Sequence, residues 1–165
     1  MKVKKIPLCF DMTDKERGYV IQNLQQSKAF EGQCIKDIVI QSINPSKDRG
    51  YHAHISKTEW FMALSGEAKL ITSEKMDKTN PDDLEVETLK ADWLKPLYLM
   101  LIPPKLAHWV MNDGEEVFVM ASFSSLEFKK EDNVDYKNDE AFWRQKSKEL
   151  LAEKAEKYLK RVKKE

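Results

Sequence analysis

Apolar residues in the middle of the chain fall into short runs separated by turn residues, which is the pattern of β-strands. The run over 35–43, IKDIVIQSI, is rich in β-branched residues and leads into the turn segment NPSKDRG. The run over 59–72, EWFMALSGEAKLIT, predicts two strands that meet at Ser65-Gly66. A third run, LYLMLI over 97–102, stops at Pro103-Pro104, because proline cannot donate a hydrogen bond to a strand ladder.

Two further segments add strands to this series. LEVETL alternates apolar and polar residues, as a strand with one solvated face does. AHWVM and EEVFVMASF flank the turn Asn112-Asp113-Gly114, which predicts a hairpin. Many short strands with regular turn signals are typical of a sandwich or barrel. We therefore expect an all-β barrel domain over residues 1–137.

The C-terminal part of the chain has a different period. Apolar residues from Phe142 onward recur at steps of three and four, which predicts an amphipathic helix within residues 138–165. Residues 144–165 contain nine Lys or Arg against four Asp or Glu. We expect this helix to pack one stripe on the barrel or on a second subunit, in preference to acting as a calmodulin-like target or a membrane-surface helix.

Composition narrows the class of protein. The 165 residues are 41% hydrophobic and 34% charged with no net charge, which indicates a globular domain and gives no reason to expect nucleic acid or a membrane as the main partner. Cys9 and Cys34 fit no metal-binding spacing and are expected to be reduced thiols. Neither a signal peptide nor a membrane-spanning run is evident, so we expect a cytoplasmic protein.

The histidines carry the candidate chemistry. His52 and His54 are two residues apart, so in a strand both point to one face, and Glu59 can join them if the chain bends in between. His108 is the third and last histidine of the chain. Three imidazoles and one carboxylate suit a divalent ion such as Zn, Fe, Mn, Ni or Co. A lone histidine would be read as a packing residue, but the joint pattern predicts a metal site.

Most other side chains near these motifs are expected to be core residues or solvated charges. The four large aromatic residues of the strands are expected to be core residues rather than sugar-stacking platforms; they are Trp60, Phe61, Trp109 and Phe118. Lys57 and Lys105 are expected to be solvated charges near the mouth of the site. Arg49 can pair with a phosphate through its planar fork, or it can be a turn residue in a surface ion pair.

Two segments together resemble the motifs of the cupin family. RGYHAHISKTEWFMALSG is similar to the first cupin motif, with its HxH, Glu and Gly66, and PPKLAHWVMN is similar to the second. Glycines usual in these motifs are replaced by Ser46, Leu97 and Lys105, at turns rather than at ligands. The resemblance covers about residues 15–126. It implies a double-stranded β-helix, or jelly-roll barrel, and a metal ion bound by His52, His54, Glu59 and His108.

Within the cupins, the chain resembles the dTDP-4-dehydrorhamnose 3,5-epimerases and the nucleotide-sugar 3,4-ketoisomerases. Residues 14–18, DKERG, and the string RGYHAH carry this likeness. It implies that His52 is the catalytic base, usually without metal. The epimerases place a tyrosine acid on the strand where this chain reads VFVMASFSS, so their ordinary mechanism does not transfer. Metal-dependent sugar isomerases of the cupin type retain the histidine that matches His108.

The favoured function is a metal-dependent isomerase or epimerase acting on a sugar or sugar nucleotide. Glu59 is the candidate proton shuttle when a metal is bound, His52 is the base without one, and Arg49 is a candidate phosphate-binding residue. The same ligand set also suits an iron-dependent dioxygenase, and a non-enzymatic ligand-binding cupin is a third reading. A homodimer is expected.

Overall fold

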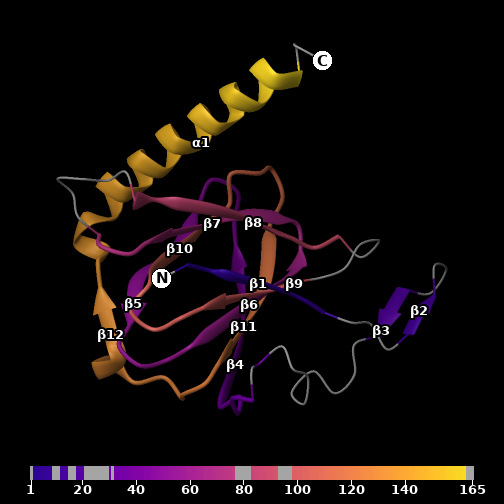
Figure 1. The fold of residues 1–165 in the computed structure, drawn as a ribbon, viewed down its shortest axis with the longest axis vertical. Coiled ribbons are helices and arrows are strands. Elements are labelled where there is room, and N and C mark those ends of the chain that lie inside the picture. Colours follow the sequence, from indigo (N-terminus) through magenta and orange to yellow (C-terminus); the bar gives the residue numbers. More distant parts are fainter. Residues whose placement is uncertain are drawn as a thin grey trace.

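The computed structural model describes residues 2–8, 12–14, 18–20, 30, 32–76, 83–92 and 98–162. These residues form two five-stranded antiparallel sheets that face each other, a separate two-stranded ribbon, and one long helix (Figure 1). The all-β barrel with a C-terminal helix predicted from the sequence is confirmed. No helix in the described ranges is long and apolar enough to cross a membrane.

The first sheet has the strand order β1-β9-β6-β11-β4. Its members are β1 (Lys4–Pro7), β9 (Tyr98–Ile102), β6 (Glu59–Ser65), β11 (Phe118–Ser124) and β4 (Asp37–Ile43). The second sheet has the order β12-β5-β10-β7-β8. Its members are β12 (Asn133–Asp135), β5 (Asp48–His54), β10 (Ala107–Met111), β7 (Glu67–Ser73) and β8 (Glu85–Lys90). The ribbon consists of β2 (Met12–Asp14) and β3 (Gly18–Val20), and Figure 1 shows it apart from the two sheets.

From β4 to β12, consecutive strands alternate between the two sheets, except that β7 and β8 pair within the second sheet, and this alternation makes the barrel. β6 and β7 meet at Gly66, as predicted, but they belong to different sheets. The hairpin predicted around Asn112-Asp113-Gly114 is wrong, because β10 pairs with β5 and β7 whereas β11 pairs with β4 and β6. The buried amide of Asn112 donates to the carbonyls of Ile43 (2.8 Å) and Glu116 (2.7 Å). These bonds hold the segment between β10 and β11 in a path that crosses from one sheet to the other.

The barrel interior has an apolar part and a polar part. The apolar part is a cluster of buried side chains from both sheets: Ile43, Phe61, Ala63, Ala68, Leu70, Leu89, Met100, Ile102, Leu106, Val110, Phe118 and Met120. A second cluster, which contains Trp60 and Phe30, lies on the other face of the first sheet. All four large aromatic side chains of the motif strands are buried, as predicted. Burial of this apolar surface is the main favourable term in forming the barrel.

The helix α1 (Glu140–Val162) follows two single 3₁₀ turns, η4 (Lys130–Asp132) and η5 (Lys137–Asp139). Trp143 and Ser147 of its first turns are buried against the second sheet, where Trp109 Nε1 donates to Ser147 Oγ at 3.1 Å. The side chains from 152 to 162 are exposed, and Figure 1 shows this half of the helix extending past the barrel.

Candidate metal centre and cavity

A β-bulge in β5 sets the direction of the first two histidines. His52 pairs with His108 across the sheet, but the next pair is Gly50 with Trp109, so Tyr51 is an extra residue on β5. Gly50 has φ +118°, and a Cβ there would lie 2.7 Å from the Trp109 Cα. Tyr51 has φ +60°, and its ring stacks on Trp109 behind the sheet. His52 and His54 therefore both face the barrel interior, while Tyr51 faces α1.

His108 lies on β10, beside His52. Its Nδ1 is 3.1 Å from the carbonyl oxygen of Leu106, a contact in which the ring nitrogen must donate. That bond fixes the tautomer, so Nε2 is the nitrogen with a free lone pair. The ring is buried, with its centroid 4.7 Å from the centroid of His52.

Glu59 reaches the histidines from the opposite sheet. It is the first residue of β6, where it pairs with Ser124 of β11. The chain between His54 and Glu59 bends, as the spacing predicted, and Asp132 holds that bend. The Asp132 carboxylate accepts hydrogen bonds from the Ser56 amide (2.9 Å), the Ser56 hydroxyl (2.5 Å) and the Lys57 amide (3.2 Å).

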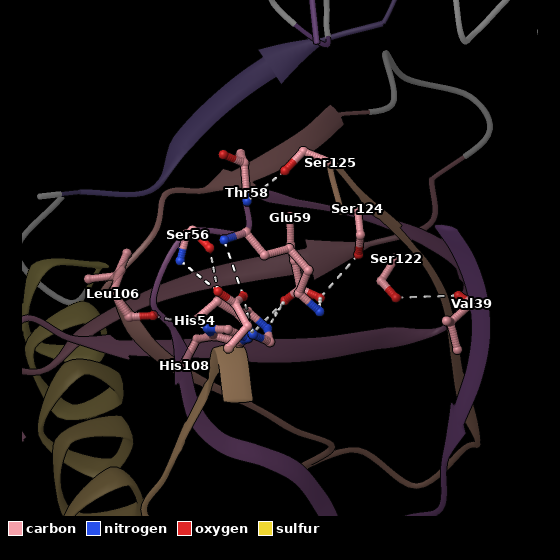
Figure 2. Close-up of polar contacts among 12 residues, drawn as sticks. Val39, His54, Ser56, Thr58, Glu59, Leu106, His108, Ser122, Ser124 and Ser125 are labelled. Carbon is pink, nitrogen blue, oxygen red and sulfur yellow. Dashed lines mark hydrogen bonds and ion pairs between the residues drawn. The ribbon is translucent and has the colours of Figure 1, made fainter. Parts of the chain in front are cut away.

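The four predicted ligands converge on one point. One donor atom from each of His52, His54, Glu59 and His108 lies within 4.8 Å of the others. Glu59 Oε2 is 3.0 Å from His54 Nε2 and 3.1 Å from His108 Nε2 (Figure 2). Such spacings match neighbouring ligands of one ion, since protein donors sit about 2.1 Å from Zn²⁺.

Unpartnered buried atoms support the same interpretation. Glu59 Oε2, His54 Nε2 and His108 Nε2 are buried and lack a hydrogen-bond partner of good geometry. Buried polar atoms are nearly always satisfied, and a shared metal ion would satisfy all three at once. The residues therefore fit a divalent ion. Their role as ligands remains a prediction.

Charge and burial shift the protonation of two members of the cluster. Burial lowers the pKa of His52 to about 3, helped by the neighbouring His108 and His54, so this imidazole is neutral at pH 7. Burial pushes the pKa of Glu59 upward, but its close contacts with His108 and His54 outweigh burial and hold that pKa well below its usual range. A neutral imidazole and an ionised carboxylate are the forms that bind metal.

A cavity of about 260 Å³ opens over the cluster. Its polar lining includes Arg49, Lys57, Ser122 and Ser124, and its apolar lining includes Val39, Phe61, Met120 and Phe128. An adjoining cavity of about 590 Å³ shares Gln41, Ile43, Arg49, Gly50 and His52 with the first and continues to Lys47 and Glu140. Arg49 is exposed and lines both cavities, so the predicted phosphate-binding residue lies where the two cavities meet.

Some functional candidates were missed or misread from the sequence. Lys57 is not the solvated charge predicted: only 8% of it is exposed, and its Nζ lies 3.1 Å from Glu59 Oε1. Lys105 is exposed, as predicted. Asp132 had no signal in the sequence, because its role depends on a bend some 75 residues away. The DKERG segment contains residues 15–17, which lie outside the described ranges.

Two facing antiparallel sheets with a His-His-Glu-His cluster between them define a cupin barrel, so the resemblance stated from the motifs is confirmed. The chain belongs to the family described as the polysaccharide biosynthesis C-terminal domain, whose model matches residues 13–136. None of the curated proteins compared matches the chain.

Solved structures with the same fold include sugar ketoisomerases. QdtA, a sugar 3,4-ketoisomerase from Thermoanaerobacterium thermosaccharolyticum in complex with TDP, is 19% identical; the match covers 90% of this chain and 96% of QdtA with a TM-score of 0.62. A 3,4-ketoisomerase from Helicobacter canadensis is 17% identical, with coverages of 88% and 97% and a TM-score of 0.63. The capsular polysaccharide assembling protein CapF from Staphylococcus aureus is 21% identical, with coverages of 59% and 25% and a TM-score of 0.51.

Proposed function

We propose that this chain isomerises a keto-sugar carried on a nucleotide, and that His52, His54, Glu59 and His108 bind a divalent metal ion for that reaction. The observation that carries the proposal is the convergence of these four side chains on the cavity of a cupin barrel. The likeness to sugar 3,4-ketoisomerases, one of them in complex with TDP-4-keto-6-deoxyglucose, supports the substrate class.

The reaction needs no oxidant or reductant. In an α-hydroxyketone, the C–H bond beside the carbonyl breaks, a C–H bond forms at the former carbonyl carbon, and one proton moves between the two oxygens. A bound divalent ion would supply Lewis-acid stabilisation of the negative charge that develops on oxygen. The two carbons are adjacent, so one base can serve both carbon sites.

Two groups of this chain can hold the moving proton. Glu59 is ionised and can act as the shuttle in the metal-bound enzyme, whereas neutral His52 faces the cavity and can act as the base in a metal-free enzyme. Within the described part of the chain no tyrosine lines the cavity over the cluster. The side chains of β11 that line this cavity are Met120, Ser122 and Ser124.

We infer the binding position of the nucleotide from the two connected cavities. We propose that the sugar occupies the cavity over the cluster and that the adjoining space takes the diphosphate and nucleoside. Arg49 lines both spaces and can bind a diphosphate with two parallel hydrogen bonds. Lys47 adds a second positive charge in the adjoining space.

Proton NMR in D₂O under anaerobic conditions tests the activity. The metal-loaded protein is incubated with TDP-4-keto-6-deoxyglucose and with related nucleotide keto-sugars. We expect a new keto-sugar and one deuterium on the sugar carbon next to its carbonyl. Glu59→Gln should abolish both signals, while Glu67→Gln, a partly exposed carboxylate away from the cavity, should leave them unchanged. Absence of a new keto-sugar with every substrate would contradict the isomerase.

An iron-dependent dioxygenase is the second candidate, because three histidines and a glutamate also bind Fe(II). Oxygen consumption by the Fe(II)-loaded protein distinguishes the two reactions, since isomerisation consumes none. A protein that binds metal and ligand but shows neither activity would be a binding cupin. The homodimer and the cytoplasmic location predicted from the sequence remain predictions.

A further inference from the structure

We propose that Lys57 is a positioning residue of the metal centre, which holds Glu59 so that only one carboxylate oxygen faces the histidines. This inference rests on the proposed metal site, because it assigns a role to a side chain that the four-ligand set does not include. It concerns the orientation of Glu59 and not a proton transfer.

The two oxygens of Glu59 have different neighbours. Oε2 faces His54 Nε2 and His108 Nε2 at 3.0 and 3.1 Å. Oε1 lies 3.1 Å from Lys57 Nζ. Oε1 also accepts a hydrogen bond from Ser124 Oγ at 3.4 Å (Figure 2). The carboxylate is therefore fixed at both oxygens, with the ammonium on one side and the imidazoles on the other.

The ammonium of Lys57 is itself held by the fold. The residue is 8% exposed, and lysine is almost never buried to this degree without a charged partner. Its amide donates to Asp132 Oδ2, and the next amide, that of Thr58, donates to Ser125 Oγ at 3.0 Å. These bonds anchor the main chain on both sides of the bend. The backbone of Lys57 is consequently fixed, and its side chain has only a short distance to span to Glu59.

Removing the ammonium would free Oε1. With only the Ser124 hydroxyl left as a partner, the carboxylate can rotate and offer both oxygens to an ion. The coordination number would then rise by one, and the ion would sit in a less defined site. Outer partners of metal ligands typically change affinity 10- to 100-fold when they are removed. Charge alone predicts tighter metal binding instead, because loss of a positive charge beside the site would strengthen its attraction for a cation.

Cobalt(II) provides the readout, because its visible absorption reports coordination number independently of turnover. Wild type, Lys57→Met, Lys57→Arg, Ser124→Ala and a control, Lys69→Met, are titrated with Co²⁺ alone and followed by absorption and calorimetry. Lys69 pairs with Glu67 and lines no cavity near the cluster, so it matches Lys57 in charge only. Circular dichroism confirms that each variant is folded.

We expect Lys57→Met to weaken Co²⁺ binding at least about 10-fold and to reduce the visible absorption, as a higher coordination number does. Lys57→Arg should restore most of the spectrum, since a guanidinium can also bind Oε1, and Ser124→Ala should have a smaller effect. Lys69→Met should match wild type. A Lys57→Met protein with the wild-type spectrum would overturn the positioning role, whether it binds Co²⁺ more weakly or more tightly. Wild type that binds no Co²⁺ would instead overturn the metal site itself.

Discussion

Arg144 of α1 forms a two-point ion pair with Asp48, the first residue of β5: Nε lies 2.5 Å from Oδ2, and Nη2 lies 2.7 Å from Oδ1. Only 3% of the Asp48 side chain is exposed. The ion pair joins the helix to the strand that carries His52 and His54. The helix thus braces the outer face of the sheet whose inner face forms the candidate site.

Substitution of Arg144 tests this brace. Arg144→Met should lower the free energy of unfolding by about 2 kcal/mol, because it leaves the buried Asp48 carboxylate without its partner; the partial exposure of Arg144 keeps the loss below that of a fully buried pair. Urea denaturation measures the change. Lys157→Met removes an exposed helix pair with Glu153 and should change stability by less than about 0.5 kcal/mol. Equal effects of the two variants would argue against the brace.

Gly50 should tolerate no side chain. Gly50→Ala would place a Cβ 2.7 Å from the Trp109 Cα and 2.8 Å from the His108 carbonyl oxygen, so β5 and β10 would have to separate. We expect a loss of at least about 3 kcal/mol in stability, measured by thermal and urea unfolding. Gly32→Ala is the control: its φ is +77°, but nothing lies within 4 Å of the added atom, so the loss should be near 1 kcal/mol. A small loss at Gly50 would show that the bulge can rearrange.

Ser46 and Lys105 replace glycines of the cupin motifs and occupy glycine-like conformations, with φ of +61° and +69°. Leu97, the third replacement, lies outside the described residues. Restoring glycine relieves left-handed strain of about 1 kcal/mol per residue but increases the entropy of the unfolded chain. We expect the double variant Ser46→Gly, Lys105→Gly to gain about 1 kcal/mol, seen as a higher urea midpoint. A loss of stability would mean that these side chains make contacts worth more than the strain.

Metal removal should destabilise the protein. An ion present at about 1,000 times its Kd adds about 4 kcal/mol to the stability of a folded protein that binds it. Addition of Zn²⁺, Co²⁺, Ni²⁺, Mn²⁺ or Fe²⁺ to chelator-treated protein should raise Tm for the ions that fit. His54→Ala and His108→Ala should abolish the rise, and Glu67→Gln should retain it. A rise that survives both histidine substitutions would place the ion elsewhere.

Arg49 should contribute to substrate binding more than to chemistry. Arg49→Met is expected to weaken binding of TDP, the neighbour's ligand, about 10-fold or more, because a charge-assisted contact with phosphate contributes about 1.5–3 kcal/mol. The turnover rate at saturating substrate should change far less. Calorimetry with TDP and steady-state kinetics separate the two effects. Unchanged TDP affinity would favour the alternative reading of Arg49 as a surface ion-pair residue.

Much of the fold could be predicted from local patterns. Strands at 37–43, 59–65, 67–73 and 98–102 follow the apolar runs closely, because alternation and β-branching are properties of the segment itself. The HxH spacing likewise places two imidazoles on one face of a strand wherever that strand lies. The predicted hairpin was wrong because its two strands join different sheets. The hydrogen bonds of the Asn112 side chain to Ile43 and Glu116 cannot be recognised from a turn pattern in the sequence.

By itself, then, the sequence determined the main strands of the barrel and the helix, and it singled out four side chains as candidate metal ligands. Only the tertiary structure decided that Gly50 and Tyr51 form a bulge, that Arg144 ties the helix to β5, and that Lys57 is buried against Glu59. Each of these depends on groups brought together from distant parts of the chain or from opposite sheets. Local propensity carries no information about such pairs, because their free energy exists only when the barrel has closed.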